Sequence, residues 1–149
     1  ELIKETIKIS EATLSQRNVK ATLESTDSII ITADRARLGQ VILNLITNSF
    51  KYGNENGHIW ITITKENNHV IIRVKDDGIG IAKENLPKLF TKRFQVDPSA
   101  NRVLGGLGLG LYICKRIIER HLGDITAKSK LHEGSTFTIS LPILNKKFK

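Results

Sequence analysis

The stretch Gly105-Gly106-Leu107-Gly108-Leu109-Gly110-Leu111 runs directly into an amphipathic segment that extends to Leu122. Glycine lets the backbone adopt conformations in which successive N–H groups point toward one spot, and the helix that follows contributes the positive end of its dipole. The stretch therefore predicts a cradle for phosphate. Glycines at this spacing are also typical of a tight loop, so a phosphate site needs partners from elsewhere in the chain.

Two well-known phosphate-binding motifs are absent from the sequence. A Walker A loop requires Gly-x-x-x-x-Gly-Lys followed by Ser or Thr, and no such run occurs. A Rossmann turn requires a strand directly before its glycines, whereas the residues from Val96 to Arg102 have the composition of a loop. Any other ligands of a phosphate must therefore come from distant parts of the chain.

The composition fits one folded domain over residues 1–149. With 149 residues, 40% of them hydrophobic, the chain can enclose a proper core, and no run of about 18 apolar residues predicts insertion into a membrane. The one cysteine, Cys114, cannot pair within the chain, which suits a reducing cytosol. We expect a cytoplasmic domain whose parent protein could itself be membrane-anchored. The chain contains no Met, so we expect it to be part of a longer protein.

The net charge of +8 raises the question of a nucleic-acid partner. The basic residues are spread over the whole length, and the densest cluster, Lys146-Lys147-Phe148-Lys149, is at the C-terminus. No basic stripe is interleaved with stacking aromatic residues, so we expect no nucleic acid to bind. A small polyanionic ligand accounts for part of the charge. The four histidines show no metal-ligand spacing, and His132 is expected in a surface turn.

Periodic apolar residues predict an α+β fold in two layers, with a mixed, mostly antiparallel sheet covered on one face by about three helices. A long helix is expected after Asp34, a residue type common at N-caps. Its predicted inner face holds Leu38, Val41, Ile42, Leu45, Ile46 and Ser49. The expected helices cover residues 2–14, 35–52, 83–90, interrupted by Pro87, and 111–122, ended by Gly123; the expected strands cover 18–24, 29–31, 59–64, 70–74, 125–130 and 136–141.

Polar residues on the long helix form a second candidate feature. Asn44, Asn48 and Tyr52 are four residues apart, with Lys51 beside them, so they share one stripe of the helix. A single Asn there would be ordinary polar surface. Together they offer an oxygen ligand for a hard cation, a positive charge for phosphate and a ring for a base.

A third feature is Asp76-Asp77-Gly78-Ile79-Gly80, which ends a predicted strand. Asp76 can accept a hydrogen bond from an amino group, while Gly78 and Gly80 permit close approach of the backbone. Asp-Gly is also a common turn dipeptide, so a plain turn is the alternative.

In this order, the motifs resemble the N, G1, F and G2 boxes of the catalytic ATP-binding domain of sensor histidine kinases, part of the gyrase, heat-shock chaperone and mismatch-repair ATPase superfamily. The resemblance extends from about Leu2 to Pro142. The boxes are residues 44–52, residues 76–81, Leu89-Phe90 with Phe94, and residues 106–111; Gly134-Ser135-Thr136-Phe137 is similar to the last box.

The resemblance implies ATP and Mg²⁺ as ligands. Asn48 would bind Mg²⁺, Asn44 would support it, and Lys51 would contact phosphate; these three are the expected catalytic residues. Asp76 would accept from the adenine amino group, Tyr52 would pack on the nucleotide, and residues 92–105 would form a lid. The implied nucleotide-binding residues are Asn44, Asn48, Lys51, Tyr52, Asp76, Gly78, Gly80, Ile81, Lys92, Arg93, Gly106, Leu107, Gly108, Leu109, Gly110, Leu111 and Ser135.

Three positions depart from the wider superfamily or from the histidine kinase pattern. Superfamily members that hydrolyse ATP typically carry Glu four residues before the metal-binding Asn, where this chain has Asn44, a neutral amide that cannot act as a general base. The usual later Arg of the F box is missing, so either Arg93 supplies that cation one turn early or the lid engages differently, and Leu107 stands where Thr is frequent. These differences leave ATP binding intact and the catalytic rate open.

The resemblance implies a kinase that donates the γ-phosphoryl group to a histidine on a separate dimerisation domain in two-component signalling, with a response regulator as an indirect partner. The fragment itself is expected to be a monomer that cannot phosphorylate itself. The alternative is a nucleotide-gated regulatory module, similar to anti-sigma factors of the same fold, that transfers no phosphoryl group.

Overall fold

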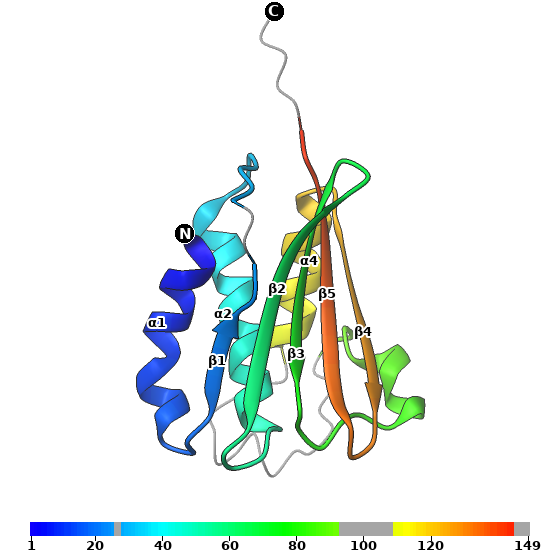
Figure 1. Cartoon of the computed structure of the whole chain (residues 1–149). Coiled ribbons are helices and arrows are strands. Elements are labelled where there is room, and N and C mark those ends of the chain that lie inside the picture. Colours follow the sequence, from blue (N-terminus) through cyan, green and yellow to red (C-terminus); the bar gives the residue numbers. More distant parts are fainter. Residues whose placement is uncertain (26–27, 93–108, 145–149) are drawn as a thin grey trace, which may run out of the picture.

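The computed structural model describes residues 1–25, 28–92 and 109–144. Its five strands form one sheet in the order β1-β2-β3-β5-β4, and the helices pack on one face of it (Figure 1). The predicted two-layer α+β fold is confirmed. The elements are α1 (Leu2–Ser15), β1 (Lys20–Leu23), α2 (Arg35–Lys51), β2 (His58–Glu66), β3 (His69–Asp76), the 3₁₀ helix η1 (Lys83–Lys88), α4 (Gly110–Arg120), β4 (Asp124–Lys130) and β5 (Gly134–Pro142).

The sheet is mixed, as predicted. β1 runs parallel to β2, while β2–β3, β3–β5 and β4–β5 are antiparallel pairs. The β2–β3 hairpin turns through Asn67 and Asn68, whose φ angles of 46° and 61° are both positive. A two-residue turn of this kind matches the twist of the strands, and Asn tolerates it well. The strands expected at 59–64 and 70–74 thus form one hairpin, and those expected at 125–130 and 136–141 form a second.

The core lies between the sheet and the helices. All six residues predicted for the inner face of α2 are buried, and Phe50 is buried beside them. Alternate residues of the strands meet them from the sheet, because side chains of a strand point to opposite faces in turn. The strand residues with at most 1% exposure are Ile59, Ile61, Val74, Ile125 and Ile139.

Both ends of α2 are fixed by side chains. The Asp34 carboxylate accepts a hydrogen bond of 3.0 Å from the N–H of Arg37, which confirms the predicted N-cap. At the other end, the Arg17 guanidinium donates to the carbonyls of Phe50 and Gly53, each at 2.7 Å. Arg17 thereby satisfies carbonyls that the end of a helix leaves open and places a positive charge at the negative pole of the helix.

Residues 29–31 do not form the predicted strand. Ile29 and Ile31 pack against the core while Ile30 is exposed, so the alternation comes from an irregular segment without a strand partner. The segment around Pro87 forms a 3₁₀ helix rather than a regular α-helix. Proline has no backbone N–H to donate within a helix, so Pro87 disfavours a regular α-helix at this position.

The end of α4 also differs from the prediction. The left-handed residue is Leu122, with φ of 60°, rather than Gly123. Gly123 is required for a different reason, since a Cβ at that position would lie 2.3 Å from the carbonyl oxygen of Ser140 on β5. Among the described residues, none of the helices has the length and apolar character needed to cross a bilayer.

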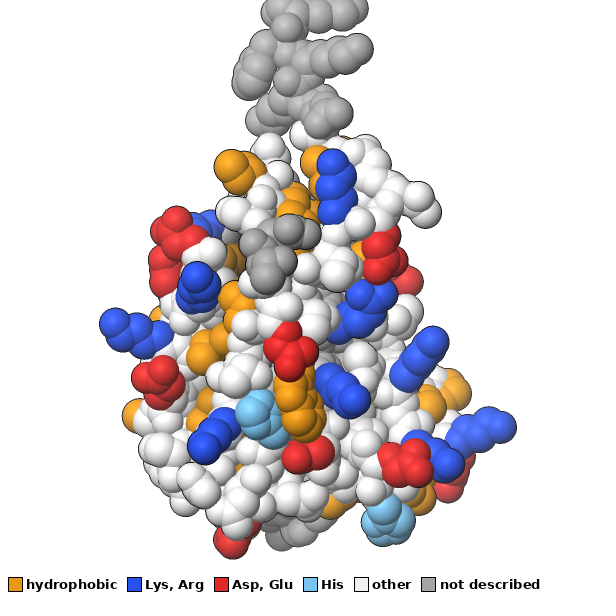
Figure 2. Space-filling model, in the orientation of Figure 1, with side chains coloured by type: hydrophobic (Ala, Val, Ile, Leu, Met, Phe, Trp, Pro, Cys, Tyr) orange, Lys and Arg blue, Asp and Glu red, His pale blue; other side chains and the backbone are white. Residues whose placement is uncertain are grey.

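The other face of the sheet has no helix over it. Figure 2 shows this face in the orientation of Figure 1, with Lys and Arg side chains dispersed among acidic ones rather than gathered in one stripe. The neutralising pairs include Arg73 with Glu66, whose Nη2 and Oε1 atoms lie 3.1 Å apart. On the described part of this face, the basic side chains in Figure 2 therefore form no continuous stripe.

Two neighbouring residues of α2 should differ clearly in how much their replacement lowers the stability of the domain. Ile42 is fully buried, whereas Leu43 is 40% exposed. We expect Ile42→Ala to lower the free energy of unfolding by about 2–5 kcal/mol, since it leaves a cavity, and Leu43→Ala to cost less than about 1 kcal/mol. Urea unfolding followed by the fluorescence of Trp60, the one tryptophan of the chain, measures both. Equal losses for the two variants would contradict this placement of α2.

Candidate nucleotide site

Several predicted site residues meet at one end of the molecule. The C-terminal end of α2, the end of β3 and the β4–β5 turn lie at the lower end of Figure 1, and the start of α4 lies higher, beside Asn44 of α2. The sequence predicted each of these segments separately, and the fold brings them together.

Asp76 is the centre of this arrangement. It is the last residue of β3 and only 7% exposed. Its Oδ1 accepts the N–H of Gly78 at 2.9 Å and the N–H of Ser135 at 3.3 Å, and its Oδ2 accepts the hydroxyl of Ser49 at 3.2 Å. The carboxylate thus joins α2, the turn after β3, and β5.

Burial raises the pKa of Asp76 above its ordinary value of 3.8, because removal from water disfavours the charged form. The hydrogen bonds from Gly78, Ser49 and Ser135 lower the pKa and so oppose this effect, while the nearby charge of Asp77 adds to it. A buried carboxylate held by three donors can serve as an acceptor for an amino group, as predicted for this residue.

The turn after Asp76 depends on its glycines. A Cβ on Gly78 would lie 2.4 Å from the carbonyl oxygen of Tyr52, and Gly80 has a φ of 72° and would bring a Cβ within 2.1 Å of the carbonyl oxygen of Lys130. No other residue type fits these two places without a shift of the backbone. The turn therefore packs directly between the end of α2 and the end of β4.

A serine that the sequence analysis did not single out fixes the far side of this turn. The hydroxyl oxygen of Ser129 accepts the N–H of Ile81 at 2.7 Å, lies 2.9 Å from the carbonyl oxygen of Gly134, and is 2.7 Å from the hydroxyl of Ser135. Ile81 and Ser135, both predicted to line the pocket of a base, are thereby connected. Ser129 lies in an otherwise ordinary strand pattern, so its sequence carries no signal of this role.

Ser49 is the second residue whose role the sequence did not show. It was predicted as a member of the inner face of α2, and it is buried there, 4% exposed. Its contact with Asp76 spans 27 positions of the chain. A small polar residue within an otherwise apolar stripe was the only available signal.

The predicted stripe on α2 is present. Asn44, Asn48, Lys51 and Tyr52 are all half-buried. A Cβ on Gly110, the first residue of α4, would lie 3.5 Å from Oδ1 of Asn44, so the start of α4 is next to this stripe. The first N–H groups of a helix have no partner within it, and those of α4 begin at Gly110 and Leu111.

The remaining predicted site residues lie at the edges of the described ranges or outside them. Lys92 is exposed and Leu109 directly precedes α4. The predicted contacts of Arg93, Gly106, Leu107 and Gly108 lie outside the described residues, as do those of Phe94 and most of the segment predicted as a lid.

The side chains at this end offer few ligands for a metal ion on its own. Within the described ranges, no three His, Cys, Asp or Glu side chains are grouped so that they could hold a metal ion. Amide oxygens from the α2 stripe are the hard donors available. Mg²⁺ takes few protein ligands and is completed by water and by phosphate oxygens, so this donor set fits Mg²⁺ bound together with a nucleotide.

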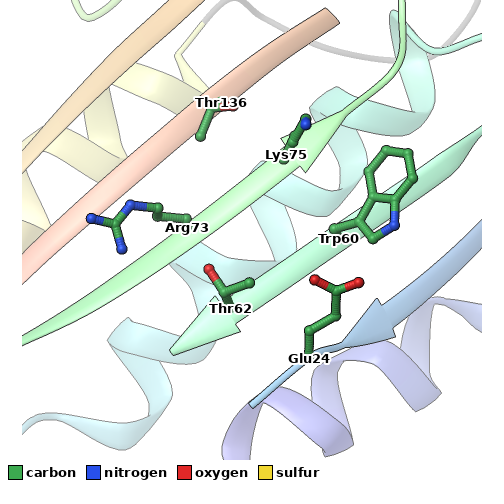
Figure 3. A pocket seen from close by; sticks show the side chains of 6 residues that line it. All are labelled: Glu24, Trp60, Thr62, Arg73, Lys75 and Thr136. Carbon is green, nitrogen blue, oxygen red and sulfur yellow. The ribbon is translucent and has the colours of Figure 1, made fainter. Parts of the chain in front are cut away.

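A hollow of about 340 Å³ lies elsewhere, on the uncovered face of the sheet. Figure 3 shows side chains of the sheet around it, from the end of β1 across to β5. Inside it, Nζ of Lys75 lies 5.6 Å from the centre of the Trp60 ring, which also stacks on His58. Because Asp76 faces α2, the hollow and the Asp76 site are on opposite faces. The lining residues are Glu24, Trp60, Thr62, Arg73, Lys75 and Thr136.

The burial of Asp76 predicts a dependence of stability on pH. Since the pKa is higher in the folded state than in the unfolded chain, the folded state binds the proton more tightly, and the free energy of unfolding falls as the pH rises from near 3.8 through the raised value. Asp76→Asn removes this titration. We expect the variant to gain stability relative to the wild type across that window and the difference to become constant above it.

Urea unfolding of both proteins between about pH 4 and pH 8 measures this difference, again with Trp60 as the reporter. A difference independent of pH would contradict the burial of an ionised carboxylate at this position.

This chain is similar to several known proteins. A family model described as histidine kinase-, DNA gyrase B-, and HSP90-like ATPase matches residues 33–145. Sensor protein SrrB of Staphylococcus aureus (strain MRSA252) is 44% identical over 111 residues, which cover 74% of this chain and 19% of that protein. Sensor histidine kinase WalK of Bacillus subtilis (strain 168) is 40% identical over 116 residues, which cover 76% of this chain and 19% of that protein.

Among solved structures, the catalytic domain of histidine kinase ThkA is 31% identical with a TM-score of 0.82, and the match covers 95% of this chain and 90% of that one. ThkA in complex with response regulator protein TrrA matches with 29% identity and a TM-score of 0.79, over 99% of this chain and 41% of that one. The chain spans about one fifth of the curated relatives' length, 19% in both cases above. Because the family model covers the α2 stripe, the Asp76 turn and α4, this chain belongs to the histidine kinase-, DNA gyrase B-, and HSP90-like ATPase family.

Proposed function

We propose that this domain binds Mg-ATP and donates its γ-phosphoryl group to a histidine on a separate dimerisation domain, as a part of two-component signalling. The observation that carries the proposal is the buried Asp76 carboxylate, held by donors from three segments next to the stripe of α2. The names of the relatives, a sensor protein and a sensor histidine kinase, support it.

Base recognition is assigned to Asp76 and the residues around it. An adenine base needs an apolar slot and one acceptor for its amino group. Asp76 supplies the acceptor, Ile81 and Ser135 border the slot, and Tyr52 packs on the nucleotide. Their connection through Ser129 supports a preformed pocket, because a site whose parts are already fixed loses less freedom on binding.

Phosphate binding is assigned to α2 and to the start of α4. Asn48 would hold the Mg²⁺ and Lys51 would contact a phosphate, while the N–H groups at the beginning of α4 point toward the anion. Bound Mg²⁺ would neutralise charge on the phosphates and orient the γ-phosphoryl group. The proximity of Gly110 to Asn44 supports this division, since it brings the start of α4 beside the stripe.

Transfer is favoured over hydrolysis by the residue at position 44. Hydrolysis needs a group that takes a proton from water, and the neutral amide of Asn44 cannot do so. A histidine acceptor brings its own lone pair. In the proposed step, an imidazole nitrogen forms a bond to the γ-phosphorus, the bond from that phosphorus to the β–γ bridging oxygen breaks, and ADP leaves with the electron pair.

The proposed partners follow from this chemistry. The acceptor is a histidine-containing helical domain of the same kinase, and a response regulator receives the phosphoryl group afterwards. The complex of ThkA with the response regulator TrrA supports such a partner for this chain. We further propose that Asn44, Asn48 and Lys51 are the residues of this chain that act on the phosphates.

The main test is reconstitution of transfer. The domain is mixed with the separately produced histidine-containing domain of its parent kinase and with ATP labelled in the γ-phosphate. We expect acid-labile label on that domain, and none when its histidine is replaced. ATP binding without any transfer would overturn the kinase assignment and would favour the regulatory module.

The metal assignment predicts a selective effect of Asn48. Wild-type affinity for ATP should be greater with Mg²⁺ than in EDTA. We expect Asn48→Ala to lose most of that gain, about tenfold or more in affinity, because the oxygen ligand is removed, while binding in EDTA is retained. Calorimetric titration under both conditions measures it. Thr47→Ala, a neighbouring change on α2, is the matched control and should keep the gain; loss of binding in EDTA as well would contradict a role limited to the metal.

A further inference from the structure

Ser49 makes an unusual contact for a serine within a helix. The hydroxyl of a helical serine commonly donates to a carbonyl one turn earlier, and Ser10 of α1 does so, with a distance of 2.8 Å to the carbonyl oxygen of Thr6. Ser49 instead donates across the domain interior to Oδ2 of Asp76, at 3.2 Å. Both serines are buried, so the difference is one of partner and not of exposure.

The two carboxylate oxygens of Asp76 accept hydrogen bonds from different donors. Two backbone N–H groups, those of Gly78 and Ser135, donate to Oδ1, and the Ser49 hydroxyl donates to Oδ2. A carboxylate offers about two acceptor sites on each oxygen. Oδ1 is therefore fully used, and Oδ2 keeps one site for a ligand. Ser49 is the side-chain donor of the three, and so the one that a substitution can remove without altering the turn.

We propose that Ser49 is a positioning residue for base recognition, whose hydroxyl holds Asp76 in the orientation and charge state in which Oδ2 accepts the amino group of adenine. This inference rests on the proposed function, in which Asp76 receives the base. It adds a residue of α2 to recognition of the base, so the helix that carries Asn48 serves both ends of the nucleotide.

Charge around Asp76 makes this hydroxyl important. The residues opposite Asp76 on β2 and β5 are Ile59 and Ser135, and with Ser49 on α2 they are all uncharged. The charged neighbour is Asp77, whose carboxylate raises the pKa of Asp76, as burial does. With no cation among these partners, neutral donors alone lower the pKa of Asp76 against the effects of burial and Asp77, and Ser49 contributes one of the three.

The charge state of Asp76 also decides which base fits. An ionised carboxylate is purely an acceptor, which suits the 6-amino group of adenine and repels the 6-oxo group of guanine. A protonated carboxyl can donate, and it would then accept guanine more readily. Loss of the Ser49 hydroxyl should therefore weaken adenine binding and reduce discrimination against guanine, and both effects should grow as the pH falls.

The test compares the wild type, Ser49→Ala, Ser49→Thr and Ser10→Ala. Binding of ADP and GDP is measured by calorimetry between about pH 5 and pH 8. We expect the ADP affinity of Ser49→Ala to decline at higher pH than that of the wild type, with a loss of about tenfold on the acid side and a smaller ADP-to-GDP ratio. Ser49→Thr retains a hydroxyl and should restore the wild-type profile. Ser10→Ala, which removes a buried helical hydroxyl far from Asp76, should match the wild type throughout.

A second measurement does not depend on nucleotide. The carboxyl carbon of Asp76 is titrated by NMR in the free proteins, and its midpoint should move to higher pH in Ser49→Ala but not in Ser10→Ala. An unchanged midpoint, or equal ADP profiles in the wild type and Ser49→Ala, would overturn the role of Ser49. Failure of the wild type to bind ADP would instead overturn the proposed function, whatever the NMR titration shows.

Discussion

The rest of this site depends on the buried carboxylate of Asp76. A charge removed from water must be compensated by fixed donors, and here they come from α2, from the turn after β3 and from β5. These donors reach Asp76 only if the backbones approach closely. A Cβ on Gly134 would lie 2.0 Å from the carbonyl oxygen of Asp76, and Gly78 is under a similar constraint. The glycines of the turn and the hairpin therefore permit the close approach that these hydrogen bonds require.

The elements that hold Asp76 are themselves held by contacts at their ends or edges, and this has a functional value. α2 is capped by Asp34 at one end and by Arg17 at the other, and β3 lies between two strands of the sheet. A site assembled on such elements keeps its donors in place before the ligand arrives. The cost is an ionised carboxylate that the core disfavours. The folded domain is thus less stable than it would be without this buried charge, but its acceptor is in place before a ligand binds. Binding sites commonly show this relation between stability and function.

The sequence predicted those features that repeat or that depend on one local rule. The periodic apolar residues of α2 and the alternation of the hairpins are strong signals, and Asp34 follows a known capping preference. The site residues near Asp76 and Asn48 were predicted from their motifs. Ser49 and Ser129 were missed because their roles depend on contacts between distant segments. Residues 29–31 were predicted as a strand because alternation alone does not reveal whether a neighbouring strand is available.

The two helices next to the proposed phosphates contact each other at both ends of α4. Near the site, Gly110 of α4 is beside Asn44 of α2. At the far end, the N–H of Asp34 donates to Nε2 of His121 at 3.0 Å, while Nδ1 of His121 lies 2.8 Å from the carbonyl oxygen of Ile117. With both ring nitrogens engaged, His121 links the start of α2 to the end of α4. The helix that carries the proposed metal ligand and the helix that carries the proposed phosphate donors are therefore in contact at two separate points along α4.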